Sequence, residues 1–195
     1  MMRRWLLVLL ISLSGCLNHP RPDAPIARHD FGDPAGRWPA GGIAIRQVKV
    51  EAAPWLDASA QLYRLQYATP LRRESFATSR WVAPPGELLE RWLERVILPA
   101  QPGGVGGCRL VIMLDELEQR FTSPTASEVV LAVRANLLQG KRLVTSKAIE
   151  ITRPASTPDS AGGVRATRAA VQALAEALAV WVGESRQLAS ACASS

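Results

Sequence analysis

The middle of the chain, residues 108 to 151, contains three long stretches with the composition of β-strands. They read CRLVIMLDELEQRF (108–121), SEVVLAVRANLLQ (127–139) and KRLVTSKAIEI (141–151), and all are rich in β-branched and other apolar residues. The last two are joined by the tight link Gln139-Gly140-Lys141, a spacing that is typical of a hairpin. These stretches predict the body of a sheet that includes an antiparallel pair.

Two further segments have the periodicity of amphipathic helices. The first is GELLERWLERVIL (86–98), and Pro84-Pro85 is expected to open it because proline is tolerated in a first helical turn. The second and longest covers about 160–184. The apolar stripes are Leu88, Leu89, Trp92, Leu93, Val96 and Ile97 in the first, and Val164, Thr167, Val171, Leu174, Leu178 and Trp181 in the second. One face of each helix therefore belongs to a core.

Shorter strands are expected ahead of the first helix. Apolar and polar side chains alternate in IAIRQVKVE (43–51) and QLYRLQY (61–67), and a third strand is expected within residues 71–81. The order strands, helix, strands, helix predicts an α+β fold, with an antiparallel β-sheet and two α-helices packed on one face. We place this domain at residues 42–186 and expect 187–195 to be a disordered C-terminal tail.

The start of the chain, RRWLLVLLISLSGC (3–16), has the features of an export signal. Two arginines precede an apolar run that is too short to cross a hydrocarbon layer of about 30 Å, so residues 1–15 are predicted to be a signal peptide. Leu13-Ser14-Gly15-Cys16 resembles the bacterial lipobox, in which the cysteine is lipidated and becomes the first mature residue. The alternatives are an ordinary secretory leader with a chance cysteine, or a leader that stays uncleaved.

Lipid attachment at Cys16 predicts a periplasm-facing protein held in a membrane, because two or more acyl chains give lasting attachment. By resemblance to Gram-negative lipoproteins, Leu17 in place of aspartate favours the outer membrane. Residues 16–41 are expected to form an extended tether, since the stretch 17–40 holds five prolines and has no regular period.

Charge and cysteine content narrow the class of protein. The chain has 23 Lys and Arg against 17 Asp and Glu, and loss of Arg3 and Arg4 with the leader reduces the basic excess to four. Such a small, dispersed excess does not indicate a nucleic-acid partner. Export allows a disulfide between Cys108 and Cys192. The sequence is equally consistent with a buried Cys108 and a free thiol at Cys192.

No catalytic, cofactor or metal site is predicted. The two histidines, His19 and His29, both lie in the expected tether and lack a rigid platform for metal binding or proton transfer. The glycine-rich run 103–107 precedes a strand, whereas a phosphate loop leads into a helix, so a flexible turn is expected there.

The one group of neighbouring carboxylates is Asp115, Glu116 and Glu118. Alternation along a strand is expected to send them to opposite faces, which favours solvated or interface charges over an acid pair. The sequence leaves open whether Arg80 and Arg134 pair with strand carboxylates or contact a partner. Trp81 is interpreted as a core residue beneath the first helix.

Several stretches together resemble a family of Gram-negative ABC-transport auxiliary lipoproteins, which work with MCE-domain lipid-transport systems. The residues that carry the resemblance are Asp30-Phe31-Gly32, Leu62-Tyr63-Arg64, Ser79 through Pro85, Leu114 through Phe121, Asp159 through Val164, and Trp181. They span almost the whole mature chain. His29 and Leu117 stand where members of the family more often have tyrosine and phenylalanine.

The resemblance implies a non-enzymatic outer-membrane lipoprotein without a cofactor. It would dock an MCE-domain protein and, through it, an inner-membrane ABC transporter that moves lipids or hydrophobic compounds. Copies are expected to form a ring around an MCE tube, with contacts near Asp115, Glu116, Glu118, Arg120 and Arg134. The alternatives are a lipid carrier with an acyl-chain pocket between helices and sheet, and a hydrolase of envelope polymers.

Overall fold

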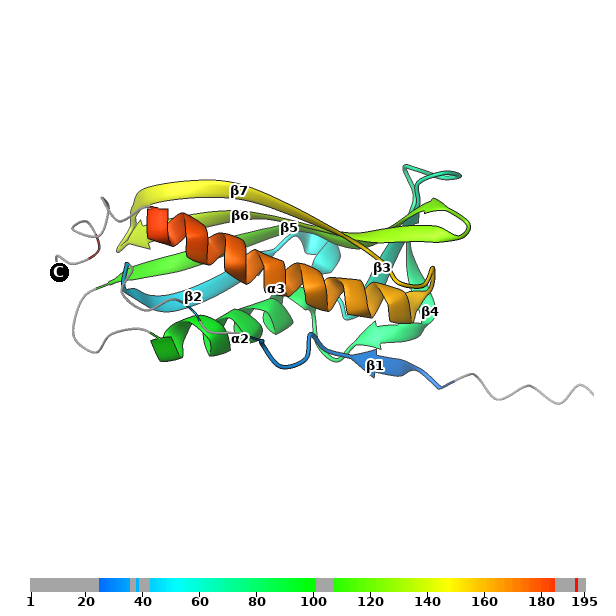
Figure 1. Ribbon diagram of the computed structural model, residues 1–195, viewed down its shortest axis with the longest axis horizontal. Coiled ribbons are helices and arrows are strands. Elements are labelled where there is room, and N and C mark those ends of the chain that lie inside the picture. Colours follow the sequence, from blue (N-terminus) through cyan, green and yellow to red (C-terminus); the bar gives the residue numbers. More distant parts are fainter. Residues whose placement is uncertain (1–24, 36–37, 39–42, 101–106, 185–191, 193–195) are drawn as a thin grey trace, which may run out of the picture.

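The computed structural model describes residues 25–35, 38, 43–100, 107–184 and 192 (Figure 1). The predicted signal peptide (1–15), Cys16, His19 and most of the glycine-rich run lie outside these residues. The strands are β1 (Ala27–His29), β2 (Ile45–Ala52), β3 (Ala60–Leu65), β4 (Arg73–Trp81), β5 (Cys108–Ser123), β6 (Ala126–Gln139) and β7 (Arg142–Pro154). The helices are α2 (Pro85–Ile97) and α3 (Ser160–Glu184), with short 3-10 turns η1 (Pro54–Leu56) and η2 (Leu98–Ala100).

All seven strands form one sheet in the order β1-β4-β3-β5-β6-β7, and β2 also pairs with β5. The α+β fold with two helices, predicted from the sequence, is confirmed. The sheet is mixed where an antiparallel one was expected, because β1–β4, β2–β5 and β3–β5 are parallel pairs. The intervening β3, β4 and α2 return the chain to the end where β2 began, so β5 enters the sheet in the same direction as β2.

Both helices lie on the same face of the sheet (Figure 1). Helix α2 packs mainly on β2, while α3 runs along β6 and β7. Side chains from both helices and the central strands fill the layer between them. Among the most completely buried are Leu89, Leu93, Ile97, Leu110, Ile112, Leu114, Leu131, Leu137 and Leu174. No helix in the described ranges has the length and hydropathy needed to cross a membrane.

The folded domain begins earlier than the sequence predicted. Strand β1 pairs in parallel with the end of β4, where Ala27, Arg28 and His29 lie opposite Ser79, Arg80 and Trp81. Phe31 and Trp38 are buried in the core. The start of the domain at residue 42 is therefore wrong, and part of the expected tether 16–41 belongs to the sheet. A strand of three residues is too short to show a period, and its partner lies about fifty positions away.

Trp81 is buried, as its interpretation as a core residue predicted. The Phe31 ring packs edge-on against it, with 5.3 Å between ring centroids. This contact ties the segment after β1 to the end of β4. The Asp30-Phe31-Gly32 stretch therefore has a packing role in addition to any other.

Cys108 and Cys192 form a disulfide, which decides between the two alternatives that the sequence left open. The bond joins the first residue of β5 to a residue 84 positions later, beyond the end of α3. Cys192 is buried, so the expected disordered tail 187–195 is wrong at this residue. A covalent link of this kind disfavours the unfolded chain by limiting its conformations.

Replacing Trp181 with alanine is expected to lower the free energy of unfolding by about 3 to 5 kcal/mol, the usual cost of removing a large aromatic side chain from a core. Trp181 is 6% exposed near the end of α3. Its neighbour Val180 is 58% exposed and provides the matched control, since Val180→Ala should change little. Chemical denaturation of both variants measures the difference; equal stabilities would contradict the core assignment.

Candidate functional site

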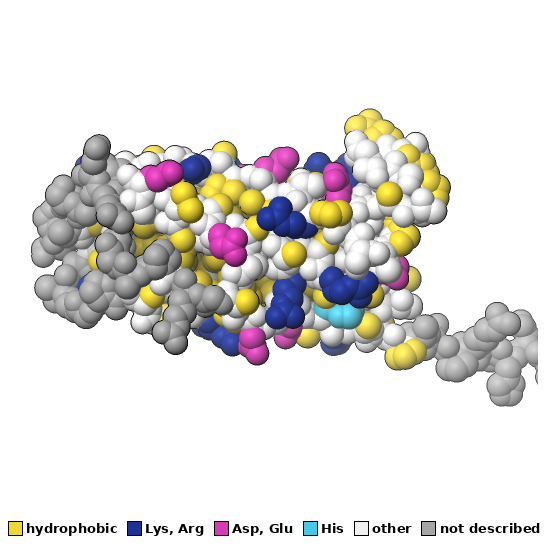
Figure 2. Space-filling view, in the orientation of Figure 1, with side chains coloured by type: hydrophobic (Ala, Val, Ile, Leu, Met, Phe, Trp, Pro, Cys, Tyr) yellow, Lys and Arg dark blue, Asp and Glu magenta, His cyan; other side chains and the backbone are white. Residues whose placement is uncertain are grey.

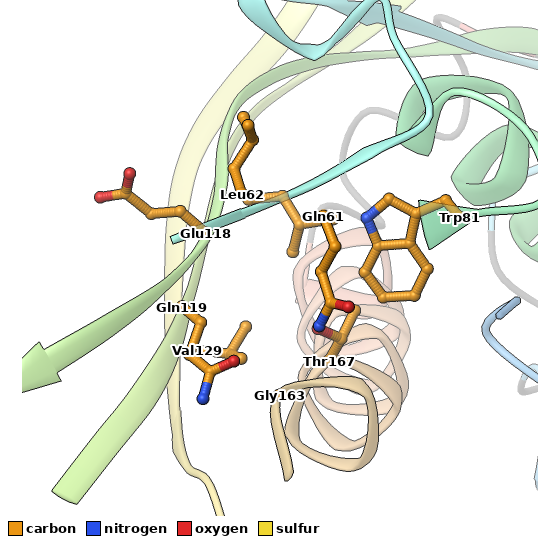
Figure 3. Close-up of a pocket in the computed structure, with 9 residues that line it drawn as sticks. Gln61, Leu62, Trp81, Glu118, Gln119, Val129, Gly163 and Thr167 are labelled. Carbon is orange, nitrogen blue, oxygen red and sulfur yellow. The ribbon is translucent and has the colours of Figure 1, made fainter. Parts of the chain in front are cut away.

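A polar cluster lies inside the layer between the sheet and the start of α3 (Figure 3). Its buried members are Gln61, Ser79, Gln119, Ser127 and Thr167. Ser79 Oγ donates to Gln61 Oε1 at 2.6 Å, and Gln119 Nε2 donates to Ser127 Oγ at 2.8 Å. Buried polar groups are costly without partners, so these contacts stabilise an otherwise apolar layer.

The same two glutamines hold the beginning of α3. Gln61 Nε2 donates to the carbonyl of Ser160 at 2.9 Å, and Gln119 Nε2 donates to that of Asp159 at 3.1 Å. The Asp159 carboxylate in turn accepts the Gly162 amide at 2.7 Å, as an N-capping residue does. That hydrogen bond is the main reason why the pKa of Asp159 lies below its usual value.

Close approach of helix and sheet at this point requires glycine. A Cβ atom at Gly163 would lie 2.0 Å from Gln119 Oε1. Gln119 Oε1 has no hydrogen-bond partner among the described residues, and the cavity beside it measures about 10 Å³. A space of that size holds one water molecule. It is far smaller than the pocket of several hundred Å³ that an acyl chain would need.

An ionic cluster occupies the opposite face of the sheet, and its centre is Glu118. The Glu118 side chain is 0% exposed. Arg64 binds it with two hydrogen bonds of 3.0 and 3.1 Å, and the Nε atoms of Arg73 and Arg120 lie 3.0 and 2.8 Å from its oxygens. Arg73 also reaches Glu116 at 2.6 Å. This ionic cluster of Arg64, Arg73, Glu116, Glu118 and Arg120 joins β3, β4 and β5.

The two glutamates titrate differently. Burial raises the pKa of Glu118, but hydrogen bonds from Arg64 and Arg120 outweigh burial, so the pKa lies below its usual value. Burial also raises the pKa of Glu116, and the negative charge of Glu118 raises it further. The positive charge of Arg73 only partly opposes this. Glu118 is therefore the firmly ionised member of the pair.

The sequence-based view of these carboxylates needs two corrections. Glu118 was expected to be solvated or at an interface, yet it is buried and bound to three arginines of its own chain. Asp115 was expected on the face opposite Glu116. The register of β5 against β6 shifts between Leu114 and Glu116, and this bulge turns Asp115 toward Arg134, which binds it with two 2.8 Å hydrogen bonds.

Other residues that the sequence singled out fall into separate places. Tyr63 and Arg64 face opposite sides of β3, as alternation predicts: the Tyr63 ring packs on Phe76 and Phe121, while Arg64 joins the ionic cluster. Arg80 donates to backbone carbonyls of its own strand. The described residues contain no group of three or more His, Cys, Asp or Glu side chains placed to hold a metal ion.

Sequence reasoning missed the polar cluster and the pairing of Glu118 with arginines of its own chain. A signal existed for two residues, because Thr167 stands within the apolar stripe of α3 and Gln119 follows Leu117 by two positions on the face toward the helices. No sequence signal indicated the role of Arg73, because its carboxylate partners lie more than forty positions away. Its contact with the Trp55 ring, at 5.3 Å, likewise joins two separate elements, η1 and β4.

The described chain is thus an α+β domain with a mixed sheet covered on one face by two helices, with its charged and polar clusters committed to internal contacts. Neither a protein family nor a curated protein matches its sequence. Its fold is similar to that of protein XCC0632 from Xanthomonas campestris, described as DUF330, with a TM-score of 0.67 and 21% identity over 85% of this chain and 98% of that one. An uncharacterized protein is also similar, with a TM-score of 0.62 and 11% identity over 82% and 99% of the two chains.

Replacing Glu118 with glutamine is expected to destabilise the domain by about 3 kcal/mol at pH 7, because it leaves three arginines around a neutral group. This is the lower end for a broken buried ion pair, since the arginines are partly exposed. Asp115→Asn is the control: it breaks an exposed pair with Arg134 and should cost less than about 1 kcal/mol. Urea denaturation measures both.

The effect of Glu118→Gln should also depend on pH. The pKa of Glu118 is lower in the folded chain than in the unfolded one, so its stabilising contribution is present above the unfolded pKa. That contribution is lost as the pH falls through the folded pKa. The stability difference between wild type and Glu118→Gln should therefore shrink toward acidic pH, and a difference that stays constant would show that the charge of Glu118 contributes nothing.

Proposed function

We propose that this protein is a non-enzymatic outer-membrane lipoprotein, anchored through Cys16, that serves as the docking component of an ABC transporter and MCE-protein system. The system would move lipids or hydrophobic compounds across the cell envelope. The observation that carries the proposal is the sequence Leu13-Ser14-Gly15-Cys16 after a short apolar run, followed by the motifs that resemble auxiliary lipoproteins. Likeness in fold to a DUF330 protein supports a domain of the expected size and architecture.

The small cavity and the paired carboxylates of the domain favour a docking role over a lipid carrier or a hydrolase. The cavity between α3 and the sheet is of one-water size, which argues against a carrier that holds an acyl chain in that layer. The carboxylates that a hydrolase would use are engaged: Glu118 by three arginines and Asp115 by Arg134. A tethered binding domain needs neither a pocket nor a reactive group, because confinement to a membrane raises its effective concentration near a partner.

Subunit contacts were expected near charged residues that the structure shows to be paired within one chain. Asp115 and Arg134 pair with each other, and Glu118 is buried, so these groups are committed within one chain. A ring of copies would instead use the sheet margin. Strand β7 offers thirteen residues and lies at the end of the strand order. An edge strand of this length can pair with another chain.

Changing Cys16 to serine is expected to abolish lipid attachment and to yield an uncleaved or soluble periplasmic form. The hydroxyl of serine cannot form the thioether that the lipobox cysteine forms. Mass spectrometry of the amino-terminal peptide and membrane fractionation measure the outcome. Ser14→Ala keeps a small residue before the cleavage site and serves as the control, which should remain lipidated. Normally processed, membrane-bound Cys16→Ser protein would exclude the lipobox assignment.

Assembly can be tested on the lipidated protein purified in detergent with and without its MCE partner. Several copies arranged by cyclic symmetry can surround a symmetric tube, whereas one domain cannot. We expect analytical ultracentrifugation to show a closed oligomer, and copurified material to contain several copies for each MCE assembly. A monomer at high micromolar concentration that recruits only as one copy would replace the ring with a single tethered adaptor.

A further inference from the structure

A basic groove of about 340 Å³ lies between the segment that begins with β1 and the first turns of α3. Its positive side chains are Arg28 on β1 and Arg165 and Arg168 on α3. Figure 2 shows dark blue basic side chains close to the cyan histidine on this side of the molecule. Phe31, Val82 and Val164 provide an apolar lining, and Val82 is half exposed. We call this the basic groove.

Within the described residues, the positive charge of the basic groove is only partly neutralised, because its lining has three arginines and one carboxylate. Asp30 is the acidic residue of its lining, and its carboxylate accepts the Gly32 amide at 2.8 Å. Asp33, nearby in sequence, is paired with Arg95 at 2.6 Å. Arg28 and Arg168 make no hydrogen bond or ion pair within the described part of the chain, although Arg168 lies near enough to Asp33 to lower its pKa slightly after Arg95.

Arg165 differs from the other two because it is held in place. Its Nε donates to Ser156 Oγ and its Nη2 to Thr157 Oγ1, both at 2.9 Å. It is one helical turn from Arg168, so the two guanidinium groups emerge on the same side of α3. Planar guanidinium groups bind phosphate oxygens through two parallel hydrogen bonds. The groove therefore combines one positioned and two available phosphate-binding groups with an apolar lining.

The place of the basic groove in the chain indicates its ligand. The described chain starts at Pro25, two residues before β1, and Cys16 precedes it by nine residues. A chain of nine residues spans at most about 30 Å. If Cys16 carries lipid, Arg28 at the edge of the groove follows it by twelve residues and lies at most about 40 Å from a membrane surface, where anionic headgroups attract arginine.

We propose that the basic groove binds the phosphate groups of anionic phospholipids in the membrane that holds the anchor. The inference rests on lipid attachment at Cys16, which is part of the proposed function. Its consequence is a defined orientation of the domain. Strand β1 and the start of α3 face the membrane, and the turn between β6 and β7, at the opposite end of the domain in Figure 1, points toward a partner.

The test uses the mature sequence from residue 17 onward, which keeps every described residue and removes the acyl chains that would mask weak binding. This sequence is expressed after a secretory signal peptide that lacks the lipobox cysteine, so that the protein is exported without lipid. Flotation assays measure the partition coefficient of the protein on two kinds of vesicle. One kind is pure phosphatidylcholine, and in the other three of every ten lipids are phosphatidylglycerol. We expect binding only to the anionic vesicles, weakened by salt. Each change of Arg28 or Arg168 to glutamine should reduce it about fivefold.

The matched control removes the same charge elsewhere. Arg142 and Lys147 are exposed on β7, at the other edge of the sheet, and Arg142→Gln with Lys147→Gln should leave binding nearly unchanged. If this control loses as much binding as a variant that combines Arg28→Gln with Arg168→Gln, the proposal is overturned in favour of net charge. Absence of binding to anionic vesicles would also overturn it. Direct binding of inorganic phosphate at millimolar concentration, without any vesicle binding, would replace the membrane by a free anion as the ligand.

Failure of this inference is distinguishable from failure of the proposed function. Lipid attachment is read separately, by mass spectrometry of the wild-type amino-terminal peptide. If the protein is lipidated but its domain does not bind anionic vesicles, the lipid anchor is supported and the proposed orientation of the domain is wrong. If Cys16 carries no lipid but the domain still binds those vesicles through Arg28 and Arg168, the lipid-binding groove is supported and the lipid anchor is wrong.

Discussion

The backbone of β5 carries hydrogen bonds to three other strands, and the rest of the domain is arranged around it. Its first half pairs with β2, its second half with β3, and its whole length with β6. The bulge between Leu114 and Glu116 separates the two halves. Beyond it Leu117 and Gln119 again point toward the helices, while Glu116 and Glu118 point away, so one irregularity keeps apolar and charged side chains on their proper faces.

The two faces of β5 stabilise the domain through different interactions. Toward the helices, leucines and tryptophans exclude water, and two glutamines anchor the start of α3. Away from them, Glu118 draws arginines from three strands into contact. These groups satisfy one another, whereas Arg28 and Arg168 of the basic groove beside β1 make no ion pair with the described residues.

The candidate sites were only partly accessible to sequence reasoning. The motif at Cys16 is local and can be recognised from consecutive residues. The polar cluster cannot, because its hydrogen bonds join residues 18 and 40 positions apart, as in Ser79 to Gln61 and Gln119 to Asp159. Neighbouring carboxylates were visible as a group, but whether Glu118 is solvated or buried depends on Arg64 and Arg73, which other strands bring to it.

The sequence by itself determined the elements whose signals are local: the bounds of α3 at 160–184, helix α2 after paired prolines, and the turn at Gly140, whose positive φ of 57° suits glycine. Only the tertiary structure decided the parallel pairing of β5 with β2 and β3, the entry of β1 into the sheet and the Cys108–Cys192 bond. Periodicity reports which face of a segment is apolar. Strand direction, register and partner are set by backbone hydrogen bonds between distant segments, which leave no period in the sequence.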